Sequence, residues 1–414
     1  MALPYSTILL SLLACAILGA IVWLCWRYWL ERQYRRRPYV APAVLDWEQQ
    51  APDAQTPPLH RVAVLGDPGA VRTDGTDPIL HLLSHWQQET GPAGTIVILG
   101  DNIYPTGLPA LEHPGRAAAE ARFQALLAAL GQYPGNIVLL SGNHDWNKGR
   151  PDGWEYLQRQ EAYVREHLPR AYYLPTNGLP GPVSLQLADG LLLVVLNTQW
   201  WVQTGPRPQS DSKEPFRQLQ QLLEQNRHQR VVVAGHHPLY SNAIHGGKFT
   251  AKQHVFPLTT VNKRAYVPLP IIGSLLPLYR KLVGAAEDMS HPRYRKMRRR
   301  LLRVLHQFPG VIYASGHDHN LQYFEKHGGH YLVSGSGSKT AFVQKGGHAT
   351  FVHENQGFFS LDFYANGETW LRTLEPGPNS GLQAGPEVFR LRLQPTHAAA
   401  PAVVPLPLLG DQVA

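Results

Sequence analysis

The feature that most constrains this chain is a pairing, repeated five times, of a short apolar run with a glycine-containing polar block. The runs are rich in Val, Ile and Leu, as expected of strands that are buried on both faces. Ligand sites in α/β sheets form outside the carboxyl ends of the strands, so the polar blocks are predicted to meet at one edge. The pairs are Val62–Leu65 with GDPG (66–69), Ile96–Leu99 with GDNIY (100–104), Ile137–Leu140 with GNHD (142–145), Val231–Val233 with AGHH (234–237) and Val311–Tyr313 with GHDH (316–319).

The spacing of these runs predicts an α/β fold. Helical stretches are expected between several strands, at residues 116–130, 153–168 and 214–226. Alternation of strands with helices favours central sheets that helices cover. Further strands are expected at 191–196, 331–333, 358–364 and 369–374.

The residue types in the five blocks point to metal binding. A single Gly-Asp after a strand is usually a turn, and a single histidine is usually hydrogen-bonded packing, but five such blocks in order favour a metal site. The chain has two cysteines, Cys15 and Cys25, and none beyond them, which excludes thiolate-bound zinc and iron–sulfur sites from the globular part. Oxygen and nitrogen ligands suit a two-metal hydrolytic site. Tyr104, three residues after Asp101, offers a phenolate, which is a strong ligand for ferric iron.

In order and spacing, the five blocks resemble those of the calcineurin-like metallophosphoesterases and, among these, the purple acid phosphatases. Most metallophosphoesterases have a histidine two residues after the first aspartate, where this chain has Gly69. Loss of that histidine together with gain of Tyr104 is the ligand exchange typical of purple acid phosphatases. GDNIYPTG, VAGHHPLYSNAIHG and GHDHNLQYF look like the small tartrate-resistant type. The resemblance spans residues 66–319 and implies a four-layer α/β/β/α sandwich of metallophosphoesterase type.

The resemblance also implies roles for individual residues. His144 would contact the phosphoryl group and protonate the leaving group, and His245 would be a second substrate histidine. Asp145 is expected either to orient His144 or to cap the following turn. The dinuclear centre would hold Fe(III) through Asp67, Asp101, Tyr104 and His319, with Asp101 bridging to a divalent Fe, Zn or Mn ion that is also bound by Asn143, His236 and His317.

The function that the resemblance implies is an acid phosphatase, which hydrolyses phosphomonoesters by attack of a metal-bound hydroxide. The alternative keeps the metals but acts as a phosphodiesterase or pyrophosphatase on a nucleotide or lipid-linked substrate. A catalytically silent binding module on a membrane tether is disfavoured, because every ligand position and His144 are intact.

The N-terminal segment Thr7–Trp26 contains twenty residues without a charge, which matches the ~20 residues that cross a bilayer as a helix. A cleaved signal peptide is the alternative, but no Lys or Arg precedes the apolar run. We therefore expect a single-pass N-terminal anchor. The arginine-rich flank favours a cytoplasmic catalytic domain, whereas the enzymes that the chain resembles usually work in oxidising compartments, so the side stays open.

The formal net charge of +8 is concentrated in two patches, at residues 27–37 and 280–303. The remainder is slightly acidic, and no nucleic-acid partner is expected. Residues 291–305 predict a basic helix that contacts anionic lipid or lies solvated over the active-site rim. The expected organisation is an anchor with a basic flank (1–37), a linker (38–58), a metallophosphoesterase domain (59–376) with an insertion at about 248–300, and a Pro/Ala-rich tail (377–414).

Overall fold

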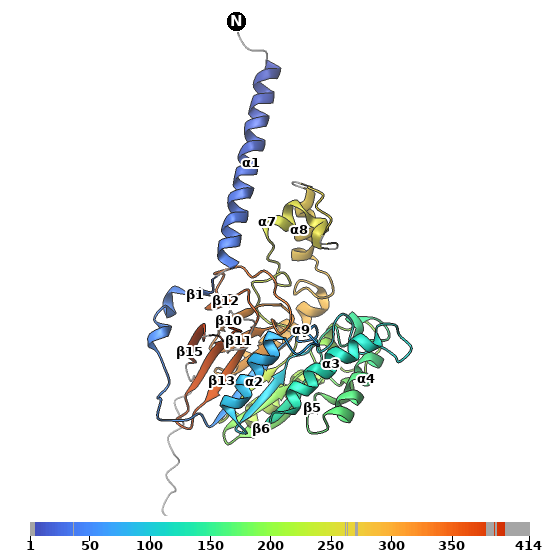
Figure 1. The fold of residues 1–414 in the computed structure, drawn as a ribbon, viewed down its shortest axis with the longest axis vertical. Coiled ribbons are helices and arrows are strands. Elements are labelled where there is room, and N and C mark those ends of the chain that lie inside the picture. Colours follow the sequence, from blue (N-terminus) through green and yellow to red (C-terminus); the bar gives the residue numbers. More distant parts are fainter. Residues whose placement is uncertain are drawn as a thin grey trace, which may run out of the picture.

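Two β-sheets pack face to face at the centre of the fold (Figure 1). The computed structural model describes residues 5–35, 37–260, 262, 264–269, 272–377, 385 and 387–393. The seven-stranded sheet has the order β15 (Phe389–Leu393), β14 (Thr369–Leu374), β13 (Phe358–Phe363), β2 (His60–Leu65), β3 (Gly94–Ile98), β4 (Asn136–Leu139) and β5 (Tyr172–Tyr173). The eight-stranded sheet has the order β1 (Tyr39–Val40), β12 (Phe351–His353), β10 (Leu321–Lys326), β11 (Gly329–Ser334), β9 (Ile312–Ser315), β8 (Arg230–Ala234), β7 (Leu191–Val195) and β6 (Val183–Ala188).

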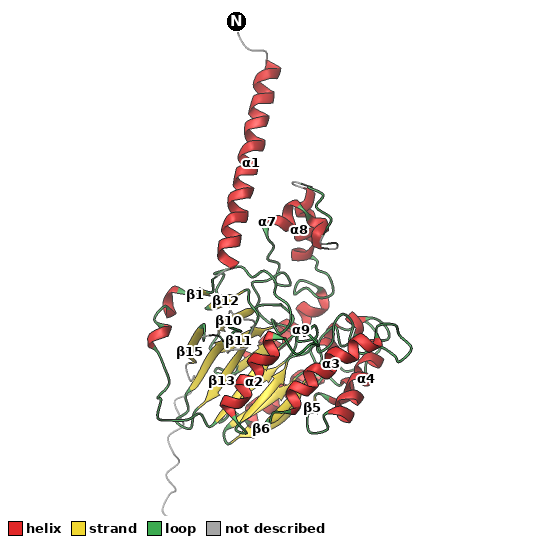
Figure 2. Cartoon of the chain, viewed as in Figure 1, coloured by secondary structure: helices red, strands yellow, loops and turns green. Residues whose placement is uncertain are grey.

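Three apolar clusters hold the layers together, which confirms the predicted four-layer α/β/β/α sandwich (Figure 2). One cluster lies between the sheets, so the central parallel strands are buried on both faces and read as continuous apolar runs. The second cluster joins the seven-stranded sheet to α2 (Pro78–Thr90), α3 (Arg116–Gly131) and α4 (Gly153–His167). The third joins the eight-stranded sheet to α5 (Gln199–Val202), α6 (Glu214–Gln225) and α9 (Pro292–Leu305).

Local sequence explains where the covering helices begin. The Asp77 side chain caps α2 by accepting hydrogen bonds from the backbone N–H groups of Ile79 and Leu80, and Pro78 occupies the first turn, where no N–H is needed. Helix α9 begins at Pro292 as expected, and it buries an apolar stripe that includes Tyr294, Met297 and Leu301 against the sheet. Its exposed face is basic, and the lipid contact expected for residues 291–305 stays a prediction.

The N-terminal helix α1 (Tyr5–Arg35) projects away from the sheets (Figure 1). Its segment Tyr5–Gln33 has a mean hydropathy of 2.7 over its most apolar window, and none of that window is buried. By length and composition it is the one helix in the described part of the chain that could cross a bilayer.

Beside α1, the described residues of 248–284 form a small projection that contains α7 (Ala251–Val255) and α8 (Leu275–Leu282) (Figure 1). Short 3₁₀ turns, Pro257–Thr260 and Ile272–Ser274, connect them. The expected insertion of about 248–300 also includes the first part of α9, which packs into a helix layer of the sandwich, and its bounds stay a prediction. Other 3₁₀ turns lie at Pro42–Val44, Trp47–Gln49, Asn147–Gly149 and Thr176–Gly178.

The expected linker and tail carry more structure than their composition indicated. Strand β1, within residues 38–58, pairs with β12, and Trp47 packs against Phe389 with ring centroids 5.8 Å apart. Strand β15, within residues 377–414, adds an edge to the seven-stranded sheet. In both segments a short apolar run pairs with a strand at the edge of a sheet. The Pro- and Ala-rich composition around these runs does not predict this pairing. Of the rest of the expected tail, residues 377, 385, 387 and 388 are described, and the others lie outside the described part of the chain.

Candidate metal centre

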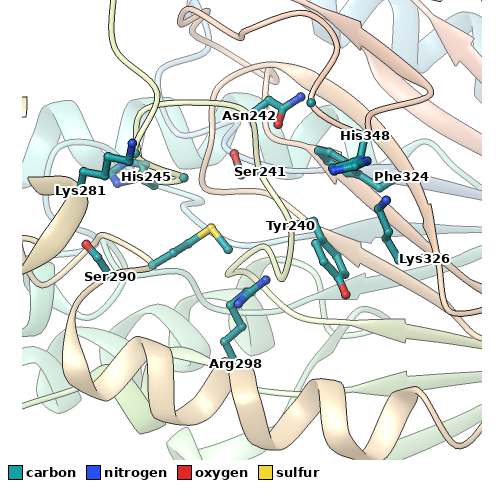
Figure 3. Close-up of a pocket in the computed structure, with 14 residues that line it drawn as sticks. Tyr240, Ser241, Asn242, His245, Lys281, Ser290, Arg298, Phe324, Lys326 and His348 are labelled. Carbon is teal, nitrogen blue, oxygen red and sulfur yellow. The ribbon is translucent and has the colours of Figure 1, made fainter. Parts of the chain in front are cut away.

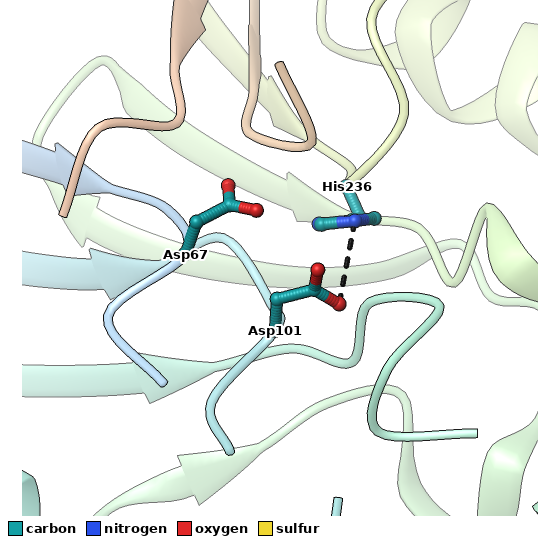
Figure 4. A group of neighbouring side chains, drawn as sticks. All are labelled: Asp67, Asp101 and His236. Atoms are coloured by element: carbon teal, nitrogen blue, oxygen red, sulfur yellow. Dashed lines mark ion pairs between the residues drawn. The ribbon is translucent and has the colours of Figure 1, made fainter. Parts of the chain in front are cut away.

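The five polar blocks meet at one edge of the sandwich, as predicted. Asp67 follows β2, Asp101 follows β3, and His236 follows β8. Figure 4 shows these three side chains pointing toward one another, and their ligand atoms all lie within 4.8 Å of each other. Asp67, Asp101 and His317 have positive φ angles of 61°, 55° and 70°. This conformation is uncommon and costly for residues with a Cβ, and residues that adopt it cluster at active sites and ligand clamps.

The phenol oxygen of Tyr104 lies at the centre of a first group of donors. Its distances are 2.8 Å to Asp67 Oδ1, 3.1 Å to Asp101 Oδ2 and 2.9 Å to His319 Nε2. Tyr104 is only 2% exposed. Burial and the adjacent carboxylates of Asp67 and Asp101 raise the pKa of the Tyr104 phenol well above its usual value. A bound cation reverses this effect, because it favours the phenolate.

A second group of donors surrounds the amide oxygen of Asn143. His236 Nε2 lies 2.9 Å from Asn143 Oδ1, and His317 Nδ1 lies 3.0 Å from the same oxygen. Asp101 joins both groups, because its Oδ1 lies 3.5 Å from His236 Nε2 while its Oδ2 faces Tyr104. Burial opposes its charged form, but the imidazoles of His236 and His144 lower the pKa of Asp101 to about 2.

Both histidines of the second group are oriented as metal ligands usually are. His236 Nδ1 lies 2.8 Å from the Leu99 carbonyl oxygen, and His317 Nε2 lies 2.9 Å from the Glu287 carbonyl oxygen. A ring N–H that donates to a carbonyl leaves the other ring nitrogen free to bind a cation. The donor set, all oxygen and nitrogen, therefore fits two hard or borderline metal ions.

Gly142 leaves the space that these donors need. A Cβ at this position would lie 2.2 Å from Asp101 Oδ1 and 2.7 Å from His236 Cε1. The glycine in the GNHD block is therefore required by close approach of the two side chains, in addition to any turn that it makes.

His144 and His245 flank the two groups. His144 Nδ1 lies 2.5 Å from the Pro105 carbonyl oxygen, and its Nε2 lies 3.8 Å from Asp101 Oδ2. The ring of His245 packs at a tilt of 32° against His317, with ring centroids 4.3 Å apart, and its Nδ1 lies 2.9 Å from Asp288 Oδ1. Burial disfavours its charge, but the bond to Asp288 and the nearby carboxylates raise the pKa of His245 overall.

The expectation that Asp145 orients His144 is corrected. Its carboxylate instead accepts hydrogen bonds from the backbone N–H groups of Asp101, Asn102 and Gly142, at 2.8, 3.0 and 2.8 Å. The side chains of Asn102 and Gln160 also donate to it. Asp145 therefore ties the loop after β3 to the loop after β4, and the Pro105 carbonyl oxygen holds the ring of His144. Burial and the charge of Asp101 raise the pKa of Asp145 to about 7.

Two side chains that lie near the donor groups, Glu287 and Lys339, were not predicted from the sequence. Glu287 Oε1 lies 3.3 Å from Asn143 Nδ2, and Lys339 Nζ lies 3.2 Å from the centroid of the Tyr104 ring. Lys339 directly follows SGSGS (334–338), where Ser338 Oγ donates to the Asp67 carbonyl oxygen at 2.6 Å. That small-residue turn after a strand was a usable signal for Lys339. No local sequence pattern predicts a role for Glu287, which precedes α9. It lies near the metal centre because the chain returns to this edge of the sandwich after residues 248–284.

Three solved structures of low identity are similar to this chain. GAP50, described as the anchor in the inner membrane complex of Plasmodium, is 16% identical over 81% of this chain and 88% of that chain, with a TM-score of 0.46. Purple acid phosphatase PPD1 from yellow lupin (Lupinus luteus) seeds is 14% identical over 80% and 53%, with a TM-score of 0.46. PhoD is 13% identical over 84% and 73%, with a TM-score of 0.48. A comparison with curated proteins gave no match.

The sequence profile of calcineurin-like phosphoesterases matches residues 60–335. This range runs from β2 to the turn after β11 and includes all five polar blocks. Members of this family are phosphoester hydrolases that use a dinuclear metal centre, which agrees with the buried Asp67, Asp101 and His236 group. Because the match covers most of the chain, the chain belongs to the calcineurin-like phosphoesterase family.

Proposed function

We propose that the protein is a phosphomonoesterase of the purple acid phosphatase type, with a dinuclear centre of Fe(III) and a divalent Fe, Zn or Mn ion. The observation that carries this proposal is the position of Tyr104, whose phenol oxygen lies 2.8 to 3.1 Å from three other ligand-type atoms. A tyrosine used only for packing has no reason to face two carboxylates and an imidazole in a buried site. The small tartrate-resistant subtype is part of this proposal.

The two donor groups assign the ligands. Asp101 faces both groups, so its carboxylate would hold a cation in each of them. Bound cations would neutralise the phosphoryl charge and lower the pKa of water at the site. The first group is Asp67, Asp101, Tyr104 and His319, and the second is Asp101, Asn143, His236 and His317.

The flanking side chains bind the substrate and move a proton. His144 is held through Nδ1 by the Pro105 carbonyl oxygen, so Nε2 is directed toward the centre, where it protonates the leaving oxygen. His245, fixed by Asp288, contacts the phosphoryl group. Lys339 adds positive charge over the Tyr104 ring, beside the first donor group. Asp145 holds the loop after β3 and the loop after β4 in fixed positions relative to each other.

The test is a visible spectrum combined with metal analysis of the purified protein. A charge-transfer band from the phenolate to iron is expected, and Tyr104→Phe should abolish it. Tyr133→Phe is a matched control, because Tyr133 is also fully buried but lies in the cluster over the outer face of the seven-stranded sheet. Phosphatase activity with no such band, or a band that survives Tyr104→Phe, would refute the iron–phenolate assignment.

A pocket next to His245 favours a second candidate function. This pocket has a volume of about 350 Å³ and lies between the insertion and the eight-stranded sheet (Figure 3). Lys281, Arg298 and Lys326 line it, and its described lining contains no carboxylate. A substrate with a second anionic group, as in a diphosphate or a lipid-linked phosphate, would place that group here. Assays of monoesters, diesters and pyrophosphates with the same preparation would separate the two functions.

We also propose that α1 anchors the protein in a membrane. The uncharged run Thr7–Trp26 and the lack of any buried residue in the most apolar window of α1 support this proposal. The positive-inside rule favours a cytoplasmic catalytic domain. Resistance of the protein to alkaline extraction from membranes tests the anchor, and protease protection of intact vesicles tests the side.

A further inference from the structure

The projection formed by residues 248–284 lies beside the C-terminal part of α1 (Figure 1). Glu31 on α1 accepts a hydrogen bond from the backbone N–H of Ala251, the first residue of α7, at 2.9 Å. This contact fixes the projection next to the helix that is proposed to cross the membrane.

Helix α8 turns an apolar stripe away from the rest of the protein. Leu275, Leu278, Tyr279 and Leu282 are 61%, 49%, 52% and 63% exposed, and their spacing places them on one helical face. The orientation of the helix is set on its other side, where Arg280 pairs with the buried Asp288 at 2.5 Å.

Exposed apolar side chains are concentrated on this projection and on α1. Of the exposed large hydrophobic residues in the described part of the chain, the projection holds nine, and all but five of the rest lie on α1. Those five, at positions 45, 59, 111, 172 and 179, are spread over the sequence. An apolar patch of this kind marks an interaction surface. Besides the stripe on α8, the projection exposes Leu258, Tyr266, Val267, Ile272 and Val283.

The charge of the projection selects its partner. Residues 248–284 contain six Lys or Arg and no Asp or Glu. Exposed apolar side chains combined with a purely basic charge are typical of segments that bind anionic lipid surfaces.

The height of the projection along α1, relative to the bilayer that α1 is proposed to cross, agrees with an anionic lipid surface as its partner. Glu31 follows Trp26, the last residue of the uncharged run, by five positions, which is about 7.5 Å along a helix at 1.5 Å per residue. The polar headgroup layer extends roughly 5–7.5 Å beyond each side of the hydrocarbon core. The contact between α1 and α7 therefore lies at the outer edge of the headgroup layer.

We infer that the projection, residues 248–284, docks onto the anionic bilayer surface that α1 crosses, with the stripe on α8 in the interface. This inference rests on the proposed anchoring by α1. Docking would hold the catalytic domain at a fixed height and orientation over the membrane. The segment that follows the projection carries Glu287 to the metal centre, so the edge with the candidate site would face the lipid headgroups.

Depth-dependent fluorescence quenching tests the contact in the full chain. An environment-sensitive dye is attached at Leu278→Cys or Leu282→Cys in a protein with Cys15→Ala and Cys25→Ala. The protein is reconstituted into vesicles of equal parts phosphatidylcholine and phosphatidylglycerol that contain a lipid with a nitroxide near the top of its acyl chain. The matched control is Asp189→Cys in the exposed β6–β7 turn, at the amino-terminal end of β7 and thus away from the metal-centre edge. Thermal unfolding followed by circular dichroism verifies that each labelled protein is folded.

We expect quenching at 278 and 282 that exceeds quenching at 189 by about twofold or more, and that weakens in vesicles of phosphatidylcholine alone. A dye on the native Cys15, with Cys25→Ala, reports on the anchor separately. Quenching at Cys15 but not at 278 or 282 would overturn the docking while leaving the anchor intact, and no quenching at any of these sites would overturn both. Self-quenching of dyes at 278 that rises with protein density, without quenching by lipid, would instead show a second copy on the stripe and overturn the inference.

Discussion

Glu287 Oε1 lies 3.3 Å from Asn143 Nδ2, and the backbone carbonyl oxygen of Glu287 lies 2.9 Å from His317 Nε2. One residue of the segment before α9 therefore contacts two members of the second donor group. The Glu287 carboxylate therefore places a negative charge beside the second donor group.

Replacing Glu287 by Gln should strengthen the binding of anionic substrates. Removal of one like charge at about 4 Å is worth about 1 kcal/mol in a solvated site, so we expect KM and the inhibition constant for inorganic phosphate to fall about fivefold. Steady-state kinetics would measure both constants. Glu155→Gln, an exposed carboxylate on α4, is the control. A rise in KM together with loss of metal would contradict this expectation and indicate that Glu287 is a ligand.

Asp101→Asn and Asp67→Asn should differ in the metals that they lose. Asp101 places one oxygen against each donor group, whereas the Asp67 carboxylate contacts Tyr104 and His319 of the first group and only the backbone N–H of His317 from the second. Asp101→Asn should therefore weaken the binding of both ions, and Asp67→Asn mainly that of the iron. The affinity for each affected ion should fall by more than the ~10–100-fold that is typical of substitutions outside the ligand set. Elemental analysis after dialysis, alongside the visible spectrum, checks this difference. Equal loss of both metals in the two variants would contradict the bridging role of Asp101.

His144→Asn should slow hydrolysis by about 10²–10⁴-fold for alkyl phosphates, which need a protonated leaving group. The loss should be much smaller for nitrophenyl phosphate, whose leaving group is a weak base. Burial lowers the pKa of His144, so the rate for alkyl phosphates should fall as pH rises through that lowered pKa. His245→Asn should instead raise KM. An equal loss of kcat for both kinds of ester in His144→Asn would argue against proton donation.

Asp145→Ala should destabilise the fold without changing the leaving-group dependence of the rate. The substitution leaves buried N–H donors of Asp101, Asn102 and Gly142 without an acceptor, and we expect a loss of about 3–5 kcal/mol in the free energy of unfolding. Urea titration measures this loss, with Asp189→Ala as the surface control. Unchanged stability with kinetics like those of His144→Asn would restore the orienting role first expected for Asp145.

Acidification should destabilise the fold in part through His60. This buried histidine has Nε2 2.9 Å from Thr95 Oγ1, and burial lowers its pKa to about 4. Because the unfolded chain takes up the proton first, the contribution of His60 is fully present above about pH 6.5 and is lost as pH falls toward about 4, up to about 3 kcal/mol. Urea unfolding at several pH values should show a flatter profile for His60→Asn than for the exposed His228→Asn. Identical slopes would exclude His60 as the cause.

The strands and the meeting of the ligand-type side chains at one edge of the sandwich were predictable from the sequence because their signals are local. Valine- and isoleucine-rich runs mark strands that are buried on both faces, and in each block the metal-ligand types follow their strand within a few residues. The distances between Asp67, Asp101, Tyr104 and His319 agree with that prediction.

The tertiary structure decided what depends on contacts between distant segments. Glu287 contacts Asn143, from which it is separated by 144 positions in the sequence. The Asp145 carboxylate accepts hydrogen bonds from the loop after β3, because that loop folds against it. Strands β1 and β15 form because sheet edges accept them, and the stripe on α8 is exposed because Arg280 fixes the opposite face to Asp288. Local residue patterns encode the preference of a segment for helix, strand or ligand chemistry, but they do not encode which remote segment will complete its hydrogen bonds or cover its apolar side.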